Sequence, residues 1–286
     1  MGTTFTRRLT AMVAALLAVA ATVVGADPAG AAPTWAPEDQ ATIHPGVQMY
    51  TEGAQCTANF IFTNGTDVLI GYAAHCAGTG AATDTNGCDS GVLPLGTPVE
   101  IQGASQPGTL VYSSWVAMQS GPRPDENTCS YNDFALVRIH PDDVAKVNPS
   151  IPHWGGPTGL NTTGTGLLST VYSYGNSSLR LGITLLSPKT GVSLGTSGGG
   201  WTHPVYTLTP GIPGDSGSAL LDSQGRAVGV LSTLAVLPTP LSNNYSDLAK
   251  AMAYARSHGM SGLTLVNGTE PFNPNQLPLH TSSLGL

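Results

Sequence analysis

The chain has 286 residues, of which 17 are acidic and 10 basic, and only 9% of its residues are charged. This balance argues against a nucleic-acid-binding protein, which needs a basic face to neutralise phosphates, and a hydrophobic content of 41% is too high for a disordered chain. The 36 glycines and 22 prolines punctuate the chain often, which favours short strands joined by turns over a helical bundle.

Residues 1–32 have the pattern of an export signal peptide. Arg7 and Arg8 supply the positive start, an apolar run follows from Leu9 to Gly25, and Ala29-Gly30-Ala31 offers small residues for cleavage. A membrane anchor is the alternative, but the apolar run is short for a span and small residues follow it at once. No later segment is apolar enough to cross a bilayer, so the mature protein is expected to be secreted, extracellular and soluble.

The remaining cysteines indicate disulfides. An even number of cysteines in an exported chain suggests two bridges, and the sequence alone allows three pairings of Cys56, Cys76, Cys88 and Cys129. A zinc site is the competing interpretation. The cysteine spacings of 20, 12 and 41 contain no C-x-x-C pair, which disfavours zinc.

Short apolar and β-branched segments follow one another along the chain, separated by Gly, Asn, Asp and Pro. The segments are 60–63, 68–74, 109–112 and 133–139 in a first group, and 166–172, 182–186, 204–208 and 227–232 in a second. Short strands at this spacing predict an all-β chain of antiparallel sandwiches or barrels. We expect one β unit over residues 33–140 and another over 160–244, joined by a Pro- and Gly-rich linker at 141–159.

One late segment, from Tyr245 to His258, has a helical pattern. Ser246 can cap this helix, its apolar residues are good helix formers, and Arg256 lies in the last turn. The tail from Gly268 to Leu286 is rich in proline and polar residues, and we expect it to be loosely ordered. Residues 245–286 should therefore form a C-terminal helix and tail.

The segment Gly214-Asp215-Ser216-Gly217-Ser218 can carry a nucleophile. A serine hydroxyl attacks poorly unless a base removes its proton. Glycines on either side let the backbone turn tightly and aim two N–H groups at one point, where they can stabilise an anionic oxygen. An ordinary polar turn is the alternative. The segment is not the G-x-S-x-G elbow of the α/β hydrolases, because position 218 is Ser.

A base and an acid occur earlier in the chain. His75 follows an apolar strand and precedes Cys76, and no other histidine among the seven has such a place. Asp133 stands at the mouth of another apolar strand, where a partly buried carboxylate needs a partner. Taken singly, His75 would be interpreted as a structural histidine and Asp133 as an aspartate that caps a turn. The order His, Asp, Ser, however, is that of chymotrypsin and not of subtilisins or α/β hydrolases.

The segments A-A-H-C, N-D-F-A-L-V and G-D-S-G-S resemble the three signature segments of the trypsin/chymotrypsin-like serine peptidases. Separations of 58 and 83 residues between His75, Asp133 and Ser216 also resemble that family over about residues 40–245, and the chain is similar to its exported bacterial, actinobacterial-type members. The resemblance implies two antiparallel six-stranded β-barrels (chymotrypsin-like) with this catalytic triad in the cleft between them. It implies a secreted serine endopeptidase that cleaves peptide bonds through an acyl-enzyme.

Further details follow from the same resemblance. It implies an oxyanion hole formed by the backbone N–H groups of Gly214 and Ser216, and a Cys56–Cys76 disulfide that leaves Cys88–Cys129 as the second. It calls for no metal and no cofactor. The expected partner is a protein or peptide substrate, with no nucleic acid or membrane involved and the protein a monomer.

The expected substrate pocket departs from the trypsin pattern. Pro210 stands where family members with trypsin specificity carry Asp, so a preference for Arg or Lys is not supported. Ser232-Thr233-Leu234 matches a family S-W-G, and Leu234 in place of glycine would narrow or block the pocket. We expect a small or medium apolar substrate side chain. Ser218 replaces a usual glycine, a small change that should be tolerated.

The sequence leaves open which residue partners Asp215 and which function the protein has. Animal members pair the Asp before the nucleophile with a new N-terminus, but the required motif is missing, so Asp215 needs another partner, Arg138 or Arg180. A protease-fold binding protein whose pocket admits no substrate is one alternative function, which Pro210 and Leu234 keep open. An esterase that uses the same triad is a second, and a structural wall or coat protein is a third.

Overall fold

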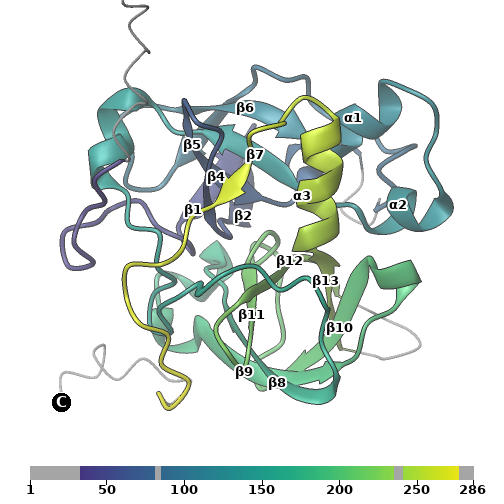
Figure 1. Ribbon diagram of the computed structural model, residues 1–286. Coiled ribbons are helices and arrows are strands. Elements are labelled where there is room, and N and C mark those ends of the chain that lie inside the picture. The colour runs from purple at the N-terminus through teal and green to yellow at the C-terminus, as the bar shows by residue number, and fades with distance from the viewer. Residues whose placement is uncertain (1–32, 81–84, 235–240, 277–286) are drawn as a thin grey trace, which may run out of the picture. The chain divides into compact units, whose positions relative to one another are not determined.

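The computed structural model describes residues 33–80, 85–234 and 241–276. The export signal expected at residues 1–32 lies outside the described residues. The described part belongs to one compact unit, in which short antiparallel strands form two sheets accompanied by a few short helices (Figure 1). The prediction of an all-β chain with a late helix is confirmed.

The first sheet has the strand order β14-β3-β4-β7-β6-β5-β1-β2. Its strands are β1 (Gln48–Thr51), β2 (Ala54–Thr57), β3 (Ile61–Thr63), β4 (Val68–Tyr72), β5 (Pro98–Ile101), β6 (Gly108–Ser113), β7 (Ala135–Arg138) and β14 (Thr264–Leu265).

The two ends of this sheet are joined by the chain itself. Only residues 58–60 separate β2 from β3, and the pairing continues through them: Ala58 N donates to Val47 O at 2.9 Å and Asn59 N to Gly71 O at 2.8 Å. β2 and β3 are thus two halves of one bent strand, which closes the sheet. With these halves counted once and β14 left aside, the eight strands become the six of the expected barrel.

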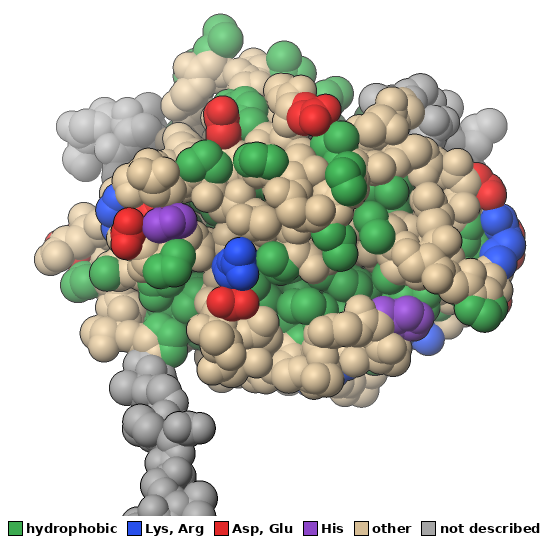
Figure 2. All heavy atoms as spheres, turned by 90° about the horizontal axis from the view of Figure 1, so that it is seen from above, with side chains coloured by type: hydrophobic (Ala, Val, Ile, Leu, Met, Phe, Trp, Pro, Cys, Tyr) green, Lys and Arg blue, Asp and Glu red, His purple; other side chains and the backbone are tan. Residues whose placement is uncertain are grey.

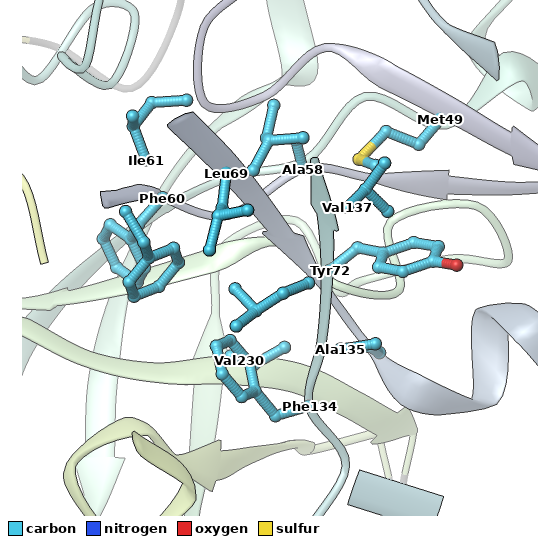
Figure 3. Close-up of a cluster of buried hydrophobic side chains, with 14 of the residues drawn as sticks. Met49, Ala58, Phe60, Ile61, Leu69, Tyr72, Phe134, Ala135, Val137 and Val230 are labelled. Carbon is cyan, nitrogen blue, oxygen red and sulfur yellow. The ribbon is translucent and has the colours of Figure 1, made fainter. Parts of the chain in front are cut away.

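The core of the first barrel brings two candidate residues to one edge. All five residues of β4 are buried, because β4 lies between β3 and β7. Figure 3 shows side chains of β4 and β7 in a shared cluster that also contains Val230 of the second barrel. The register pairs Tyr72 of β4 with Ala135 of the antiparallel strand β7. His75 follows Tyr72 by three residues and Asp133 precedes Ala135 by two, so both lie at the same end of the sheet.

The second sheet is a closed barrel with the order β10-β13-β12-β11-β8-β9. Its strands are β8 (Leu167–Tyr174), β9 (Pro188–Leu194), β10 (Thr202–Thr207), β11 (Ala219–Asp222), β12 (Ala227–Leu234) and β13 (Asn243–Asp247). A small apolar core fills it, formed by Val171, Val205, Leu220, Val228, Leu231 and Tyr245. Ser216 lies in the turn that leads into β11.

The late helix begins later than predicted. α3 spans Leu248–Ser257, and its cap is Asp247, whose Oδ1 accepts the N–H of Lys250 at 2.7 Å. Ser246, the cap expected from the sequence, is still part of β13, and its hydroxyl instead donates to the carbonyl of Tyr131. The strand therefore continues to Asp247, whose carboxylate takes over the cap.

Short helices that the sequence did not predict complete the described part. They are α1 (Ser114–Gln119), α2 (Glu126–Tyr131) and 3-10 turns at Ala74–Ala77, Pro141–Lys146, Ser178–Arg180, Thr184–Leu186 and Gly198–Gly200. Among the described residues, no helix is long and apolar enough to cross a membrane. On the face in Figure 2, basic side chains are few and scattered, with acidic ones near them.

The expectation of a loose tail is wrong for residues 268–276. Gly268 N donates to Pro157 O at 2.8 Å, and Glu270 N donates to Ser150 Oγ at 2.9 Å. The ring of Phe272 meets that of Tyr172 edge to face, with 5.3 Å between centroids. The tail's polar and proline-rich composition is typical of a loop, but distant residues satisfy its backbone groups and order it. Residues 277–286 lie outside the described part.

Candidate active site

His75 and Asp133 form a tight pair at the end of the first barrel. The imidazole Nδ1 of His75 lies 2.6 Å from Oδ2 of Asp133, and the backbone N–H of His75 donates to Oδ1 at 2.9 Å. Asp133 is only 2% exposed. Two contacts to one carboxylate fix both the position of the 3-10 turn that carries His75 and the orientation of its ring.

His75 and Asp133 also shift each other's pKa. Burial alone would lower the pKa of the His75 imidazole, but the charge and hydrogen bond of Asp133 outweigh burial and raise that pKa above 6.5. Burial alone would raise the pKa of the Asp133 carboxyl, but His75 and the hydroxyl of Ser232 hold it below its usual range. Asp133 therefore stays ionised in neutral solution, and the imidazole is a stronger base than a free histidine.

Ser232 has a role that the sequence did not reveal. It was expected only as a pocket wall, and it does line the cavity described below, but its Oγ also donates to Oδ2 of Asp133 at 2.6 Å. Because Ser232 lies in β12 of the second barrel, this hydrogen bond joins the two barrels at the buried carboxylate.

Glycines shape the turn around Ser216. Gly214 and Gly217 have φ of 94° and 90°, a left-handed conformation that L side chains rarely adopt. A Cβ at Gly214 would also lie 2.2 Å from Oε1 of Gln55, and one at Gly217 would lie 2.4 Å from the carbonyl oxygen of Thr57. Both positions therefore require glycine for conformation, and Gly217 also requires it for space, because its neighbour is a backbone oxygen.

The same turn leaves two donors unused. Ser216 O accepts from Thr57 N at 2.8 Å, and Gly214 O accepts from Thr57 Oγ1 at 2.7 Å. Among the described residues, the N–H groups of Gly214 and Ser216 have no acceptor in the protein. These are the two groups expected to form an oxyanion hole.

His75 and Ser216 line one cavity of about 700 Å³. Within the described residues no hydrogen bond joins Ser216 Oγ to the His75 ring; such bonds are often long before substrate binds. The first barrel contributes Ala54, Gln55, Cys56, His75, Cys76, Gly78, Gly80, Thr85 and Trp115 to the lining, and the second contributes Gly211–Gly214, Ser216, Leu231–Leu234 and Asn243.

Three of the four residues predicted for the substrate pocket line this cavity. Ser232, Thr233 and Leu234 line the cavity, and Leu234 is 46% exposed, so it does not seal it. Pro210 does not line the cavity and is exposed. The wall begins one residue later, at Gly211, because the chain turns inward there and Gly211 is buried.

Both disulfides have the predicted pairing. Cys56–Cys76 ties β2 to the turn that carries His75, and Cys88–Cys129 ties a loop to α2. Cys56, His75 and Cys76 are close enough together to suggest a metal site. A disulfide offers no thiolate, however, and thiolates are the form in which cysteine binds metals, so these residues do not fit a metal.

Asp215, next to Ser216, is held by two cations. It is fully buried, and both terminal nitrogens of Arg180 donate to its two oxygens, with Nη2 2.7 Å from Oδ2. Arg180, one of the two expected partners, is therefore the correct one, whereas Arg138 lies exposed on β7. The second cation, Lys189, was not predicted from the sequence; it is 1% exposed, and its Nζ lies 3.4 Å from Asp215 Oδ2.

Replacing Arg180 by methionine should reduce the free energy of unfolding by about 3 kcal/mol, because a buried carboxylate that loses a partner is strongly destabilising. Lys189 remains beside Asp215, so the loss should lie at the lower end of the usual range. Thermal or denaturant unfolding measures it. The control is Arg138→Met, which should stay within about 0.5 kcal/mol of wild type. Equal effects of the two substitutions would contradict this role of Arg180.

Comparisons with known proteins agree with this fold. No protein-family model and no curated protein sequence matches the chain. Protease A of Thermobifida fusca is similar in structure, with a TM-score of 0.51 and 19% identity over 80% of this chain and 100% of that one.

Two further solved structures match with lower TM-scores. The Nocardiopsis protease is 18% identical, with a TM-score of 0.47, and the match covers 78% of this chain and 98% of that one. The chymotrypsin of Cellulomonas bogoriensis is also 18% identical over 78% and 98%, with a TM-score of 0.43. With its closed second barrel, its first barrel closed by a bent strand and its similarity to the Thermobifida enzyme, the chain has the double-barrel fold of the trypsin/chymotrypsin-like serine proteases.

Proposed function

We propose that this chain is a secreted serine endopeptidase of the trypsin/chymotrypsin-like family, with His75, Asp133 and Ser216 as its catalytic triad. The observation that carries the proposal is the 2.6 Å contact between His75 and the buried Asp133 on a cavity that Ser216 also lines. The unused N–H groups of Gly214 and Ser216 add a site for an anionic oxygen beside the nucleophile.

The proposed mechanism uses these groups in turn. Ser216 Oγ attacks the carbonyl carbon of the scissile peptide bond while His75 Nε2 takes its proton, and the carbonyl oxygen becomes an anion held by the N–H groups of Gly214 and Ser216. His75 then gives the proton to the departing amine, and the C–N bond breaks to leave an acyl ester on Ser216. Water, deprotonated by His75, hydrolyses this ester. Asp133 keeps Nδ1 protonated and stabilises the imidazolium.

The disulfides and the cavity lining also support the proposal of a secreted peptidase. Disulfides persist in oxidising surroundings outside the cytoplasm, which agrees with the export signal expected at residues 1–32. No described residue that lines the cavity is acidic or basic apart from His75, which favours an uncharged side chain in a peptide substrate. None of the proposed steps calls for a metal or cofactor, and a single chain supplies all of the proposed groups.

A fluorophosphonate probe tests the proposal, since it reacts only with a serine activated by a base. The purified secreted protein should gain the mass of one probe less HF, because fluoride leaves as the Ser216 Oγ–P bond forms and the hydroxyl proton is lost. Peptide mapping should locate the label on Ser216 and not on Ser218. Hydrolysis of peptide anilides should accompany labelling. Absence of labelling in a folded, oxidised protein would contradict the triad and favour a binding protein. Cleavage of esters without amides would instead identify an esterase.

A further inference from the structure

The cavity runs between two walls that belong to the second barrel. One wall is the segment Gly211–Gly214, which precedes the nucleophile, and the other is the end of β12, Leu231–Leu234. Asn243, the first residue of β13, pairs with Leu234 across the β12–β13 ladder and also lines the cavity. Its side chain is therefore placed to reach from one wall toward the other.

Asn243 bridges these walls. Its Oδ1 accepts the backbone N–H of Gly211 at 2.7 Å, and the residue is only 2% exposed. A backbone N–H can only donate, so the bonded atom is the amide oxygen and the orientation of the amide is determined. The NH2 group of Asn243 is consequently the end left to face a ligand.

Side chains pack closely around the backbone of Gly211 beside this bridge. A Cβ added to Gly211 would lie 2.8 Å from Asn243 Nδ2 and 3.0 Å from Leu231 Cδ2. Both side chains thus pack directly against the Gly211 backbone. The amide of Asn243, the side chain of Leu231 and the backbone of Gly211 therefore form one closely packed part of the cavity lining.

We propose that Asn243 closes the pocket for the substrate residue whose carbonyl is attacked, and so restricts that residue to small uncharged side chains such as Ala, Ser and Thr. The inference rests on the proposed peptidase function. A longer side chain would collide with the bridge between Asn243 and Gly211. A charged one would be buried without an opposite charge, since among the described residues the lining offers none except His75.

The test compares peptide anilides that differ only in the residue before the cleaved bond. Wild type should cleave the Ala and Ser substrates with the highest kcat/KM and those with Leu, Phe, Lys or Glu poorly. Asn243→Ala removes the bridge and should raise kcat/KM for the Leu substrate relative to the Ala substrate by at least about tenfold, the usual discrimination for a methylene-sized difference.

Asn244→Ala is the matched control. Asn244 is the next residue of the same strand and does not line the cavity; its amide donates to Thr233 Oγ1 at 3.1 Å. This variant should keep the preference of wild type for small residues. If both variants change the preference equally, the effect belongs to the strand in general, and the role assigned to Asn243 is wrong.

Fluorophosphonate labelling separates the two possible failures, because the probe carries no amino-acid side chain. If Ser216 is labelled but wild type prefers large or charged residues, or Asn243→Ala leaves the preference unchanged, the inference is wrong while the peptidase proposal stands. If Ser216 is not labelled, both are wrong. If Asn243→Ala does not fold, the preference of wild type for the residue before the cleaved bond tests the inference by itself.

Discussion

Alanine in place of Ser216 is expected to lower kcat for a peptide substrate by about 10⁶-fold, the loss typical of removing the nucleophile from a triad that acts as a unit. KM should change little, because the cavity walls and the N–H groups of Gly214 and Ser216 stay in place. Initial rates with a peptide anilide measure kcat, and the residual rate reports what binding and the N–H groups contribute without covalent catalysis.

Ser218→Ala is the control for this experiment. Ser218 is fully buried two residues further on, and its hydroxyl is bonded to the carbonyl of Asp215, so it is not available for attack. The variant should still be labelled by the fluorophosphonate at Ser216. Activity that survives in Ser216→Ala but disappears in Ser218→Ala would mean that the nucleophile has been assigned to the wrong serine.

Asp133→Asn should lower kcat by about 10⁴-fold, because an amide no longer holds His75 in the tautomer that accepts a proton at Nε2. The pH profile should change as well. His75 must be neutral to act as a base, and its pKa is raised above 6.5 by Asp133, so wild-type kcat/KM should fall on the acid side with a midpoint above 6.5. Removal of the carboxylate's charge should move that midpoint to lower pH.

The second buried His–Asp pair supplies a matched control. His203 Nε2 lies 2.8 Å from Asp247 Oδ2, the histidine is fully buried, and neither residue lines the cavity. Asp247→Asn should leave both kcat and the acid limb as in wild type. A similar loss in both variants would show that Asp133 acts through stability and not through His75.

Local patterns explain why the strands and the triad could be predicted. The apolar run that becomes β4 is buried throughout, and the motifs around His75 and Ser216 are short segments in which chemistry depends on adjacent residues. Glycine at 214 and 217 was expected for a tight turn, and the positive φ at both positions confirms it.

Partners distant in sequence explain most of what could not be predicted. Ser232 reaches Asp133 from 99 positions away, and Asn243 reaches Gly211 from 32. Lys189 lies in strand β9, where no neighbouring residue in the sequence indicates a contact with the carboxylate of Asp215. Each is an ordinary residue for its segment and acquires its role only when the chain has folded and brought these distant segments together.

The strand β14 also affects the order in which the protein can fold. It pairs Thr264 with Thr63, so the edge of the first barrel is covered by residues about 200 positions later in the chain. A chain made from its N-terminus exposes this edge of β3 until residues 264 and 265 have been synthesised. Closing so long a loop favours late pairing of β14 with the first sheet. A partly made chain therefore has a hydrogen-bonding strand edge exposed until the residues of β14 are available to cover it.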